Sequence, residues 1–381
     1  MLNEDHRQVQ DLLRRVAREQ VAPRAADIDR TAEYPQDMFD LLKGLGIFAL
    51  PFPEEYGGAN STLSACLAVE ELGRVCYNTA YLLVVQWTAF GAVLSGGTDD
   101  QKRQLLPDLA SGARRASISV TEPQSGSDVN GIKTRAHRRP GGYSISGAKV
   151  WCTGAPISDY ILVAARTGDD NTPAGINFFL VERGTKGFEI GRKEEKIGAR
   201  GIPSCPLFLD DVFVPTENCL GLEKGGFKRV MEAFNTARPI HAARGVGLAQ
   251  GAMDHAIEFT QSRRAFGQTV DNFQGVRWIL ADMSIQIEAA RSLVYRVAQM
   301  IDDGLSGKAL APMAATAKTF ATDTAMKVSI DAVQLFGASG ITAEYPINRY
   351  MRDAKVLQII EGTNQIQRNI VANALLGPVR H

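Results

Sequence analysis

The sequence predicts an α+β protein of three successive parts: an N-terminal helical domain over residues 1–116, a central antiparallel β-barrel or β-sandwich over 117–225, and a C-terminal four-helix bundle over 226–381. Apolar residues recur at three- and four-residue spacing in the first and last parts, as in amphipathic helices. Between them lie short runs rich in β-branched and aromatic residues. The length of 381 residues also exceeds that of a typical single core, which favours several domains.

The N-terminal part combines helical spacing with longer apolar stretches. Proline and glycine clusters at residues 51–53 and 57–60 interrupt the pattern, as turns do. The predicted helical runs are Val9 to Val16, Met38 to Leu42, Leu63 to Leu72 and Tyr81 to Leu94.

The central part contains short β-type runs with glycine, proline, aspartate and asparagine between them. Gly141-Gly142 and residues 168–171 are the predicted turns. No helical segment alternates with the strands, which argues against a parallel βαβ sheet. The predicted strands are Tyr143 to Ile145, Tyr160 to Ala165, Ile176 to Val181 and Leu207 to Val214.

The C-terminal part predicts long helices near residues 226–261, 271–304, 308–336 and 346–376. Within the first of them, the glycines of residues 245–251 superficially resemble a dinucleotide-binding fingerprint. Their spacing is one residue too long and no strand precedes them, so we interpret them as a site of close helix packing.

Composition and charge exclude several classes of function. Lys and Arg together number 42, as do Asp and Glu together. The resulting net charge of zero argues against nucleic acid as the main partner. Five scattered cysteines and isolated histidines predict reduced thiols and no metal site. The N-terminus has the character of neither a signal peptide nor a transit peptide, and no apolar run is expected to span a membrane. We expect a cytoplasmic protein, or a mitochondrial matrix protein whose leader has been removed.

Two motifs leave a choice between a binding site and ordinary structure. The loop Ser125-Gly126-Ser127-Asp128 lacks the surroundings of a nucleophilic serine, but it suits a phosphate as well as a plain turn. Trp151 stands at a predicted strand end, where core packing is the ordinary role of a tryptophan. Thr153 and Gly154 beside it favour a planar ligand at the same place.

A carboxylate interrupts the last helical region. Glu361 follows an apolar run and precedes Gly362-Thr363-Asn364, which indicates a break between two helical segments. This carboxylate could be the first-turn acid of the next helix, where the helix dipole favours negative charge. Alternatively, apolar neighbours raise its pKa by desolvation and suit it to act as a general base.

Taken in order, several motifs resemble the acyl-CoA dehydrogenase family over nearly the whole chain. Each motif is short, but their order on a helix–β–helix plan makes the resemblance specific. The motifs are PEEYGG (53–58), VTEPQSGSD (120–128), WCT (151–153), LDDVFVP (209–215), RRAFG (263–267), QLFG (334–337), MRDAK (351–355) and EGT (361–363) with Gln367-Arg368 after it.

The resemblance implies an FAD held between the β domain and the C-terminal helices of a homotetramer, with an electron-transferring flavoprotein as electron acceptor. The substrate would be an acyl-CoA, and its implied binding residues are Ser127, Asn235, Arg238 and Gly362. The implied FAD-binding residues are Val120, Thr121, Ser127, Trp151, Thr153, Gln274, Gln334, Gly337, Thr363 and Gln365, with Arg263 and Phe266 reaching the FAD of a neighbouring subunit.

By the same resemblance, the reaction is α,β-dehydrogenation of an acyl-CoA thioester to the trans-2-enoyl-CoA. Glu361 would take the α-proton, and its backbone N–H together with a ribityl hydroxyl of FAD would polarise the thioester carbonyl. The β-hydride would go to flavin N5. Two alternatives stay open: a dehydrogenase, reductase or oxidase acting on acyl groups held by a carrier protein, and a non-catalytic partner subunit of the same fold.

Several positions depart from the common pattern of the family. Gly154-Ala155 replaces the usual Asn-Gly after the Trp-x-Thr motif, and Ala338 replaces a second glycine after Gly337. Asn235 replaces a frequent acid. The segment around Arg238 contains no glutamate, so the alternative base position of some branched-chain members is absent.

Overall fold

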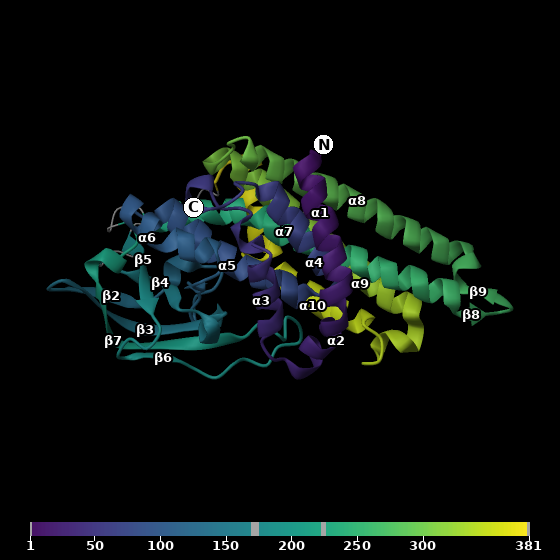
Figure 1. Ribbon diagram of the computed structural model, residues 1–381, viewed down its shortest axis with the longest axis horizontal. Coiled ribbons are helices and arrows are strands. Elements are labelled where there is room, and N and C mark those ends of the chain that lie inside the picture. The colour runs from purple at the N-terminus through teal and green to yellow at the C-terminus, as the bar shows by residue number, and fades with distance from the viewer. Residues whose placement is uncertain (1, 169–174, 222–225, 379–381) are drawn as a thin grey trace.

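The computed structural model describes residues 2–168, 175–221 and 226–378, and it shows a curled sheet at one end of a long set of helices (Figure 1). The predicted turn at residues 168–171 lies outside the described residues beyond Gly168. The helices of the N-terminal part are α1 (Glu4–Val16), α2 (Ala22–Thr31), α3 (Gln36–Gly44), α4 (Thr62–Val75), α5 (Tyr77–Gly96) and α6 (Asp99–Ala110).

The helix α5 is long and apolar enough to cross a membrane by length and composition. The expectation that no apolar run reaches this length is therefore wrong. Of the apolar window, 78% is buried inside the protein, where α5 packs against α4 and α7 as a core helix. Burial on all sides explains the missing polar face that the helical pattern would otherwise show.

The central sheet has the strand order β1-β4-β2-β3-β7-β6, with β5 paired to β4. Most pairs are antiparallel as predicted, but β1 and β2 both pair with β4 in parallel. Parallel neighbours need a crossover connection, and the β2–β3 hairpin supplies the one between β1 and β4. The strands are β1 (Ala116–Ser119), β2 (Arg135–Arg139), β3 (Gly142–Thr153), β4 (Tyr160–Arg166), β5 (Ile176–Glu182), β6 (Phe188–Ile190) and β7 (Ser204–Pro215).

The C-terminal part is a helical bundle whose last helix is broken where the sequence predicts a break. A short hairpin of β8 (Arg264–Ala265) and β9 (Gln268–Thr269) projects from the far end of α7 (Figure 1). The helices are α7 (Gly226–Ser262), α8 (Gln274–Asp302), α9 (Gly307–Phe336), α10 (Ile347–Ile359) and α11 (Asn364–Leu376).

Glycines of α7 bring its backbone directly against α4. A Cβ added at Gly247 would lie 2.1 Å from the Glu70 carbonyl oxygen, and one at Gly251 would lie 1.9 Å from that of Arg74. Only glycine fits such an approach. The packing interpretation of residues 245–251 is thus confirmed, and these glycines form no dinucleotide fingerprint.

The helices at both ends of the chain share one core. A continuous cluster of buried apolar residues runs from Leu13 in α1 to Leu357 in α10, whereas the sheet has a second cluster around Ile145 and Val163. The helix α7 joins these parts because it packs against α4, α5, α8, α9 and α10. A side chain on α7 can therefore face residues from both helical parts, and α7 also packs against β5 of the sheet.

Candidate active site

The break between α10 and α11 holds Glu361 in a strained conformation. Its φ is +57°, in the left-handed region that side chains with a Cβ rarely adopt. Gly362 follows with a φ of +81°, and the Thr363 hydroxyl then caps α11 by accepting from the Ile366 N–H at 3.3 Å. Glu361 therefore precedes the helix cap, so its interpretation as a first-turn acid is wrong. Such strain persists where the surrounding structure enforces it, often at functional sites.

Two buried side chains hold this loop from the inside. Lys318 of α9 donates to the Gly362 carbonyl at 3.0 Å, and Gln367 of α11 donates to the Glu361 and Gly362 carbonyls at 3.1 Å each. A Cβ on Gly362 would lie 2.6 Å from the Gln367 amide nitrogen, so the clamp requires glycine. Among the described residues, the Glu361 N–H meets no acceptor, which leaves it available to a ligand.

The Glu361 carboxylate lies at the edge of a buried polar cluster. Its side chain is 23% exposed, and its Oε2 lies 3.7 Å from His241 Nε2. Burial raises the pKa of the Glu361 carboxyl above 4.5, while the charges of Arg244, Lys318 and Arg238 oppose that rise. A carboxylate with a raised pKa is suited to accept a proton.

The same face of α7 carries three polar residues at three-residue spacing, Arg238, His241 and Arg244. Of these, the sequence predicts only Arg238 as a site residue, although polar residues at this spacing in an apolar helix indicate one polar face. Arg244 Nη2 lies 3.3 Å from His241 Nδ1, and because a guanidinium only donates, Nδ1 must accept. Burial and neighbouring cations lower the pKa of His241 well below 6.5. The neutral imidazole therefore carries its proton on Nε2, which lies 3.4 Å from the Thr88 hydroxyl and 3.7 Å from Glu361.

Two tyrosines of α5 surround Arg244. Its guanidinium carbon lies 4.5 Å from the ring centre of Tyr77 and 4.0 Å from that of Tyr81. The Tyr81 hydroxyl lies beside both Arg244 and Thr153. Tyr81 thus connects the face of α7 to the end of β3, and neither tyrosine was predicted to belong to the site.

The end of β3 presents Trp151 and Thr153. Trp151 has a φ of +62° and is 57% exposed, so its interpretation as a core residue is wrong. The Thr153 hydroxyl lies 3.2 Å from that of Ser204 and is partly exposed. Gly154, with a φ of +81°, lets this end approach α5, because a Cβ there would lie 3.0 Å from Val85. An open aromatic face next to a hydroxyl is compatible with a planar ligand.

A buried ion pair fixes the strand segment beside β3. Lys149 Nζ contacts Glu122 at 2.7 Å and the Val120 carbonyl at 3.1 Å, and the Val150 N–H donates to the Thr121 carbonyl at 2.9 Å. Val120 and Thr121 are partly exposed next to Trp151.

The Ser125–Asp128 loop divides its two hydroxyl groups. The Ser125 hydroxyl closes the turn by donating to the Asp128 carbonyl, while Ser127 is exposed. The loop is therefore a turn whose exposed hydroxyl remains available.

The predicted residues for CoA contact each other on α7. Arg238 donates to the Asn235 side-chain oxygen, and Arg238 Nε is buried without a partner among the described residues. Burial lowers the pKa of Arg238, and Glu361 opposes this effect. Arg238 lies about one helical turn from His241, and Asn235 lies about one turn further along α7.

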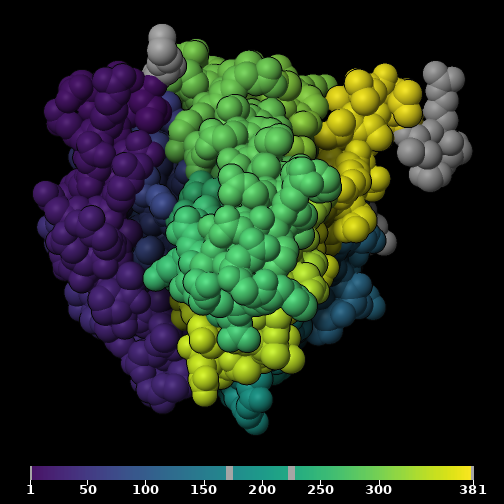
Figure 2. All heavy atoms as spheres, turned by 90° about the vertical axis from the view of Figure 1, so that its right-hand side faces the viewer, coloured from purple at the N-terminus to yellow at the C-terminus, as the bar shows by residue number. Residues whose placement is uncertain are grey.

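A second group of predicted residues lies at the other end of α7. Arg263, Phe266 and Gln274 follow that end, where Phe336 stacks on Phe259 with ring centres 4.2 Å apart. From Arg238 to Arg263 the helical rise of about 1.5 Å per residue gives a separation of roughly 37 Å. Figure 2 views this end, with α8 (green) between the N-terminal helices and the C-terminal segments. Gln334 and Gly337, at the end of α9, belong to this second group as well. The second group therefore lies far from Glu361 of the same chain.

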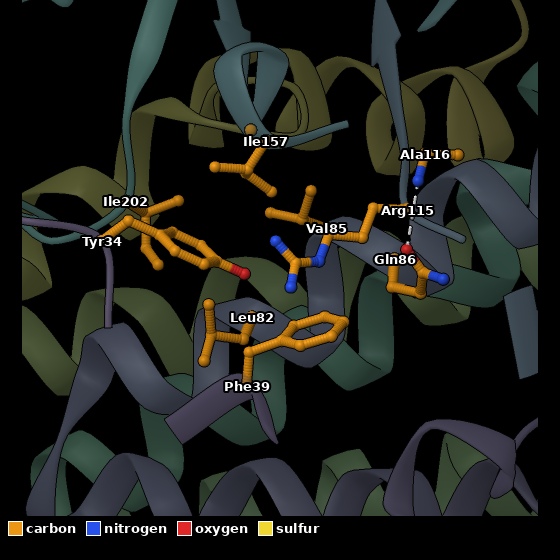
Figure 3. A pocket seen from close by; sticks show the side chains of 10 residues that line it. Tyr34, Phe39, Leu82, Val85, Gln86, Arg115, Ala116, Ile157 and Ile202 are labelled. Carbon is orange, nitrogen blue, oxygen red and sulfur yellow. Dashed lines mark hydrogen bonds between the residues drawn. The ribbon is translucent and has the colours of Figure 1, made fainter. Parts of the chain in front are cut away.

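A small cavity lies beside α5, between α3 and the start of β1 (Figure 3). The Arg115 guanidinium points into it beside the Tyr34 hydroxyl and stacks 3.8 Å from the Phe39 ring centre. The α5 residues Leu82 and Val85 line it, whereas Tyr77 and Tyr81 contact Arg244. Gly154 also lines the cavity, which therefore borders the end of β3, whereas its lining includes neither Glu361 nor Arg244.

Comparisons with known proteins agree over all three parts of the chain. The N-terminal, middle and C-terminal domains of acyl-CoA dehydrogenase match residues 3–113, 117–212 and 224–376. The cyclohexane-1-carbonyl-CoA dehydrogenase of Geobacter metallireducens is 40% identical over 376 residues, 98% of each chain. The solved butyryl-CoA dehydrogenase of Megasphaera elsdenii matches with a TM-score of 0.95 at 36% identity, over 99% of each chain. A chain in a structure of the electron transferring flavoprotein of Acidaminococcus fermentans gives the same TM-score, identity and coverage.

Proposed function

The chain belongs to the acyl-CoA dehydrogenase family, and we propose that it converts an acyl-CoA thioester to the trans-2-enoyl-CoA with Glu361 as the base. The observation that carries this proposal is the Glu361 loop itself. It combines a strained backbone, a clamp by Lys318 and Gln367, and a carboxylate that is open at one edge with a raised pKa.

The protein groups around Glu361 fit removal of an α-proton. The carboxylate accepts the proton, and the His241 Nε2–H beside it limits the positions that the carboxylate can take. The free Glu361 N–H would donate to the thioester carbonyl and stabilise the developing enolate. Because Lys318 and Gln367 hold the carbonyls of this loop, the N–H is directed without reorganisation.

The residues present also fit FAD. The exposed Trp151 ring would flank the flavin, the Thr153 hydroxyl would bond its edge, and Val120 and Thr121 would line it. The start of α11, with Thr363 and Gln365, suits a pyrophosphate, because helix N-termini attract anions. When bound, FAD supplies the acceptor for the β-hydride.

A homotetramer would complete the cofactor site. Arg263 and Phe266 lie too far from Glu361 to serve the same cofactor within one chain, and Phe266 is 95% exposed. Trp278 and Ile285 of α8 are also exposed, at 62% and 66%, on an element next to this hairpin. Apolar side chains so exposed favour burial against a second copy. We further propose that an electron-transferring flavoprotein reoxidises the enzyme, in the cytoplasm or, after removal of a leader, in the mitochondrial matrix.

The experiment is anaerobic bleaching of the flavin by a panel of thioesters. The panel includes butyryl-CoA and cyclohexane-1-carbonyl-CoA, after which two relatives are named. We expect bleaching of the wild-type protein, and retained FAD and substrate binding without bleaching in Glu361→Gln. Bleaching only by carrier-protein thioesters would indicate the alternative substrate class, and a colourless protein would contradict the proposal.

A further inference from the structure

We propose that Arg244 binds a carboxylate at the far end of the acyl group, so that the preferred substrate is the thioester of a short dicarboxylic acid. This inference rests on the proposed function and deepens it by assigning the chemistry of the acyl tail.

Arg244 is fully buried but only partly satisfied. Its exposed fraction is 0%, and its Nη2 contacts His241 Nδ1 at 3.3 Å. Its Nε and Nη1 have no hydrogen-bond partner among the described residues. A buried donor without a partner carries a desolvation penalty, which a bound acceptor would remove.

The stacking of two tyrosines on Arg244 does not satisfy these donors. Both ring centres lie close to the guanidinium carbon, with ring planes 67° apart, and a ring attracts the cation without supplying an acceptor oxygen to Nε or Nη1, which have no partner among the described residues. Stacking alone would therefore explain the burial of Arg244 but not its two free donors. The buried Tyr77 hydroxyl also lacks a partner, so a further donor stands beside the same guanidinium.

The local charge also favours an anion. Within the described residues, Lys149 pairs with Glu122 and Arg291 pairs with Glu70, but Arg244 has no carboxylate in ion-pair contact. The positive charges of Arg244, Lys318 and Arg238 all lower the pKa of Glu361, so three cations face a single carboxylate. Asp323 also acts on Lys318, but it is itself paired with Arg368. A buried guanidinium fork matches the two oxygens of a carboxylate.

The position of Arg244 sets the class of acyl group. One imidazole ring separates it from Glu361, and the Tyr81 hydroxyl joins it to Thr153 at the predicted flavin edge. A thioester held at Glu361 could thus reach Arg244 with its tail. An extended chain advances roughly 1.2 Å per bond, so diacids of about four to six carbons fit this arrangement.

The test compares matched thioesters on the FAD-loaded protein: glutaryl-CoA against valeryl-CoA, and adipyl-CoA against hexanoyl-CoA. We expect kcat/KM for anaerobic bleaching to favour the diacid of each pair by at least about tenfold. In Arg244→Met this ratio should fall by on the order of 100-fold, because the carboxylate would then be buried unpaired. Arg244→Lys keeps the charge without the fork and should restore the ratio in part.

Two controls separate recognition from folding. Arg291→Met removes a partly buried arginine that pairs with the buried Glu70, on α8, and should leave the ratio unchanged even if it lowers the melting temperature. Calorimetric binding of the same pairs to Glu361→Gln reports affinity without turnover, and glutaryl-CoA should bind more tightly than valeryl-CoA. Equal or inverse preference in the wild type, or an unchanged ratio in Arg244→Met, would overturn the inference. Absence of bleaching by every thioester would instead contradict the proposed function.

Discussion

Glu122 and Glu361 are both carboxylates in the protein interior, but their surroundings are opposite. Glu122 is 2% exposed and accepts from Lys149 Nζ at 2.7 Å and from the N–H groups of Lys133 and Thr134 at 2.6 and 3.0 Å. Among the described residues the Glu361 carboxylate accepts no hydrogen bond, and its ion-pair contact to His241 is 3.7 Å long. The charges of three cations lower the pKa of Glu361, whereas Glu122 forms an ion pair with a single cation, Lys149.

This difference separates a structural carboxylate from a reactive one. Glu122 accepts from Lys149 of β3 and from the Thr134 N–H, and Lys149 also donates to the Val120 carbonyl, so the charge of Glu122 is fully paired. Glu361 keeps its oxygens free next to an exposed edge, on a backbone that is strained rather than relaxed. An ionised group that is buried without partners is unfavourable for folding, so its presence points to a ligand or a reaction.

The largest effect on stability is expected when the structural pair is broken. Lys149→Met leaves the Glu122 carboxylate buried without its cation and should lower the free energy of unfolding by about 3–5 kcal/mol. Chemical denaturation of the holoprotein measures this change. The double variant Glu122→Gln/Lys149→Met should recover much of the loss. A single variant as stable as the wild type would show that the pair does not hold this region.

The reactive carboxylate should behave in the opposite way. Glu361→Gly abolishes turnover but relieves the left-handed backbone at a φ of +57°, which is unfavourable by about 1–2 kcal/mol for a residue with a Cβ. We therefore expect a melting temperature equal to or above that of the wild type. Glu361→Gln is the matched control, since it loses the charge and keeps the strain. Destabilisation in Glu361→Gly alone would contradict the assigned strain.

The two carboxylates should also differ in their pH dependence. Burial would raise the pKa of Glu122, but Lys149 and its hydrogen bonds lower it to about 2, whereas burial raises that of Glu361. The base acts when ionised, so kcat/KM should fall as the pH drops through the raised pKa of Glu361. The stability due to Glu122 is present above 4.5 and is lost only as the pH falls toward about 2. Acid inactivation should therefore be reversible and precede unfolding.

A variant of this experiment identifies the charge that acts on the base. Of the three cations that lower the pKa of Glu361, Arg244 has the largest effect. Its replacement in Arg244→Met should move the acid limb of kcat/KM for valeryl-CoA to higher pH. A limb that stays in place would show that Arg244 does not act on Glu361.

Much of the fold could be predicted because helical spacing is local. The four predicted helical runs of the N-terminal part coincide with α1, α3, α4 and α5, and the break before Gly362 was predicted from the residues themselves. The parallel pairing of β4 could not be predicted, since it depends on which strands meet after the β2–β3 hairpin. The burial of α5 likewise depends on neighbours that are distant in sequence.

The site could be predicted only in part. Glu361, Trp151 and Thr153 are marked by short motifs, whereas the roles proposed for Gln274 and Gln334 stay predictions. Arg238, His241 and Arg244 share a visible spacing, yet the sequence does not tell which face of α7 meets α5. The two tyrosines of α5 were hidden for the same reason, because their contacts with Arg244 come from tertiary packing.

The most direct test of Glu361 as the base separates proton removal from hydride loss. A thioester with sulfur in place of the β-carbon has α-hydrogens but no β-hydride to lose, so its α-hydrogen exchange in D2O reports the base alone. Mass spectrometry should show rapid exchange with the wild-type holoprotein and exchange slower by on the order of 100-fold or more with Glu361→Gln, at equal ligand occupancy. Exchange at the wild-type rate in Glu361→Gln would contradict the account.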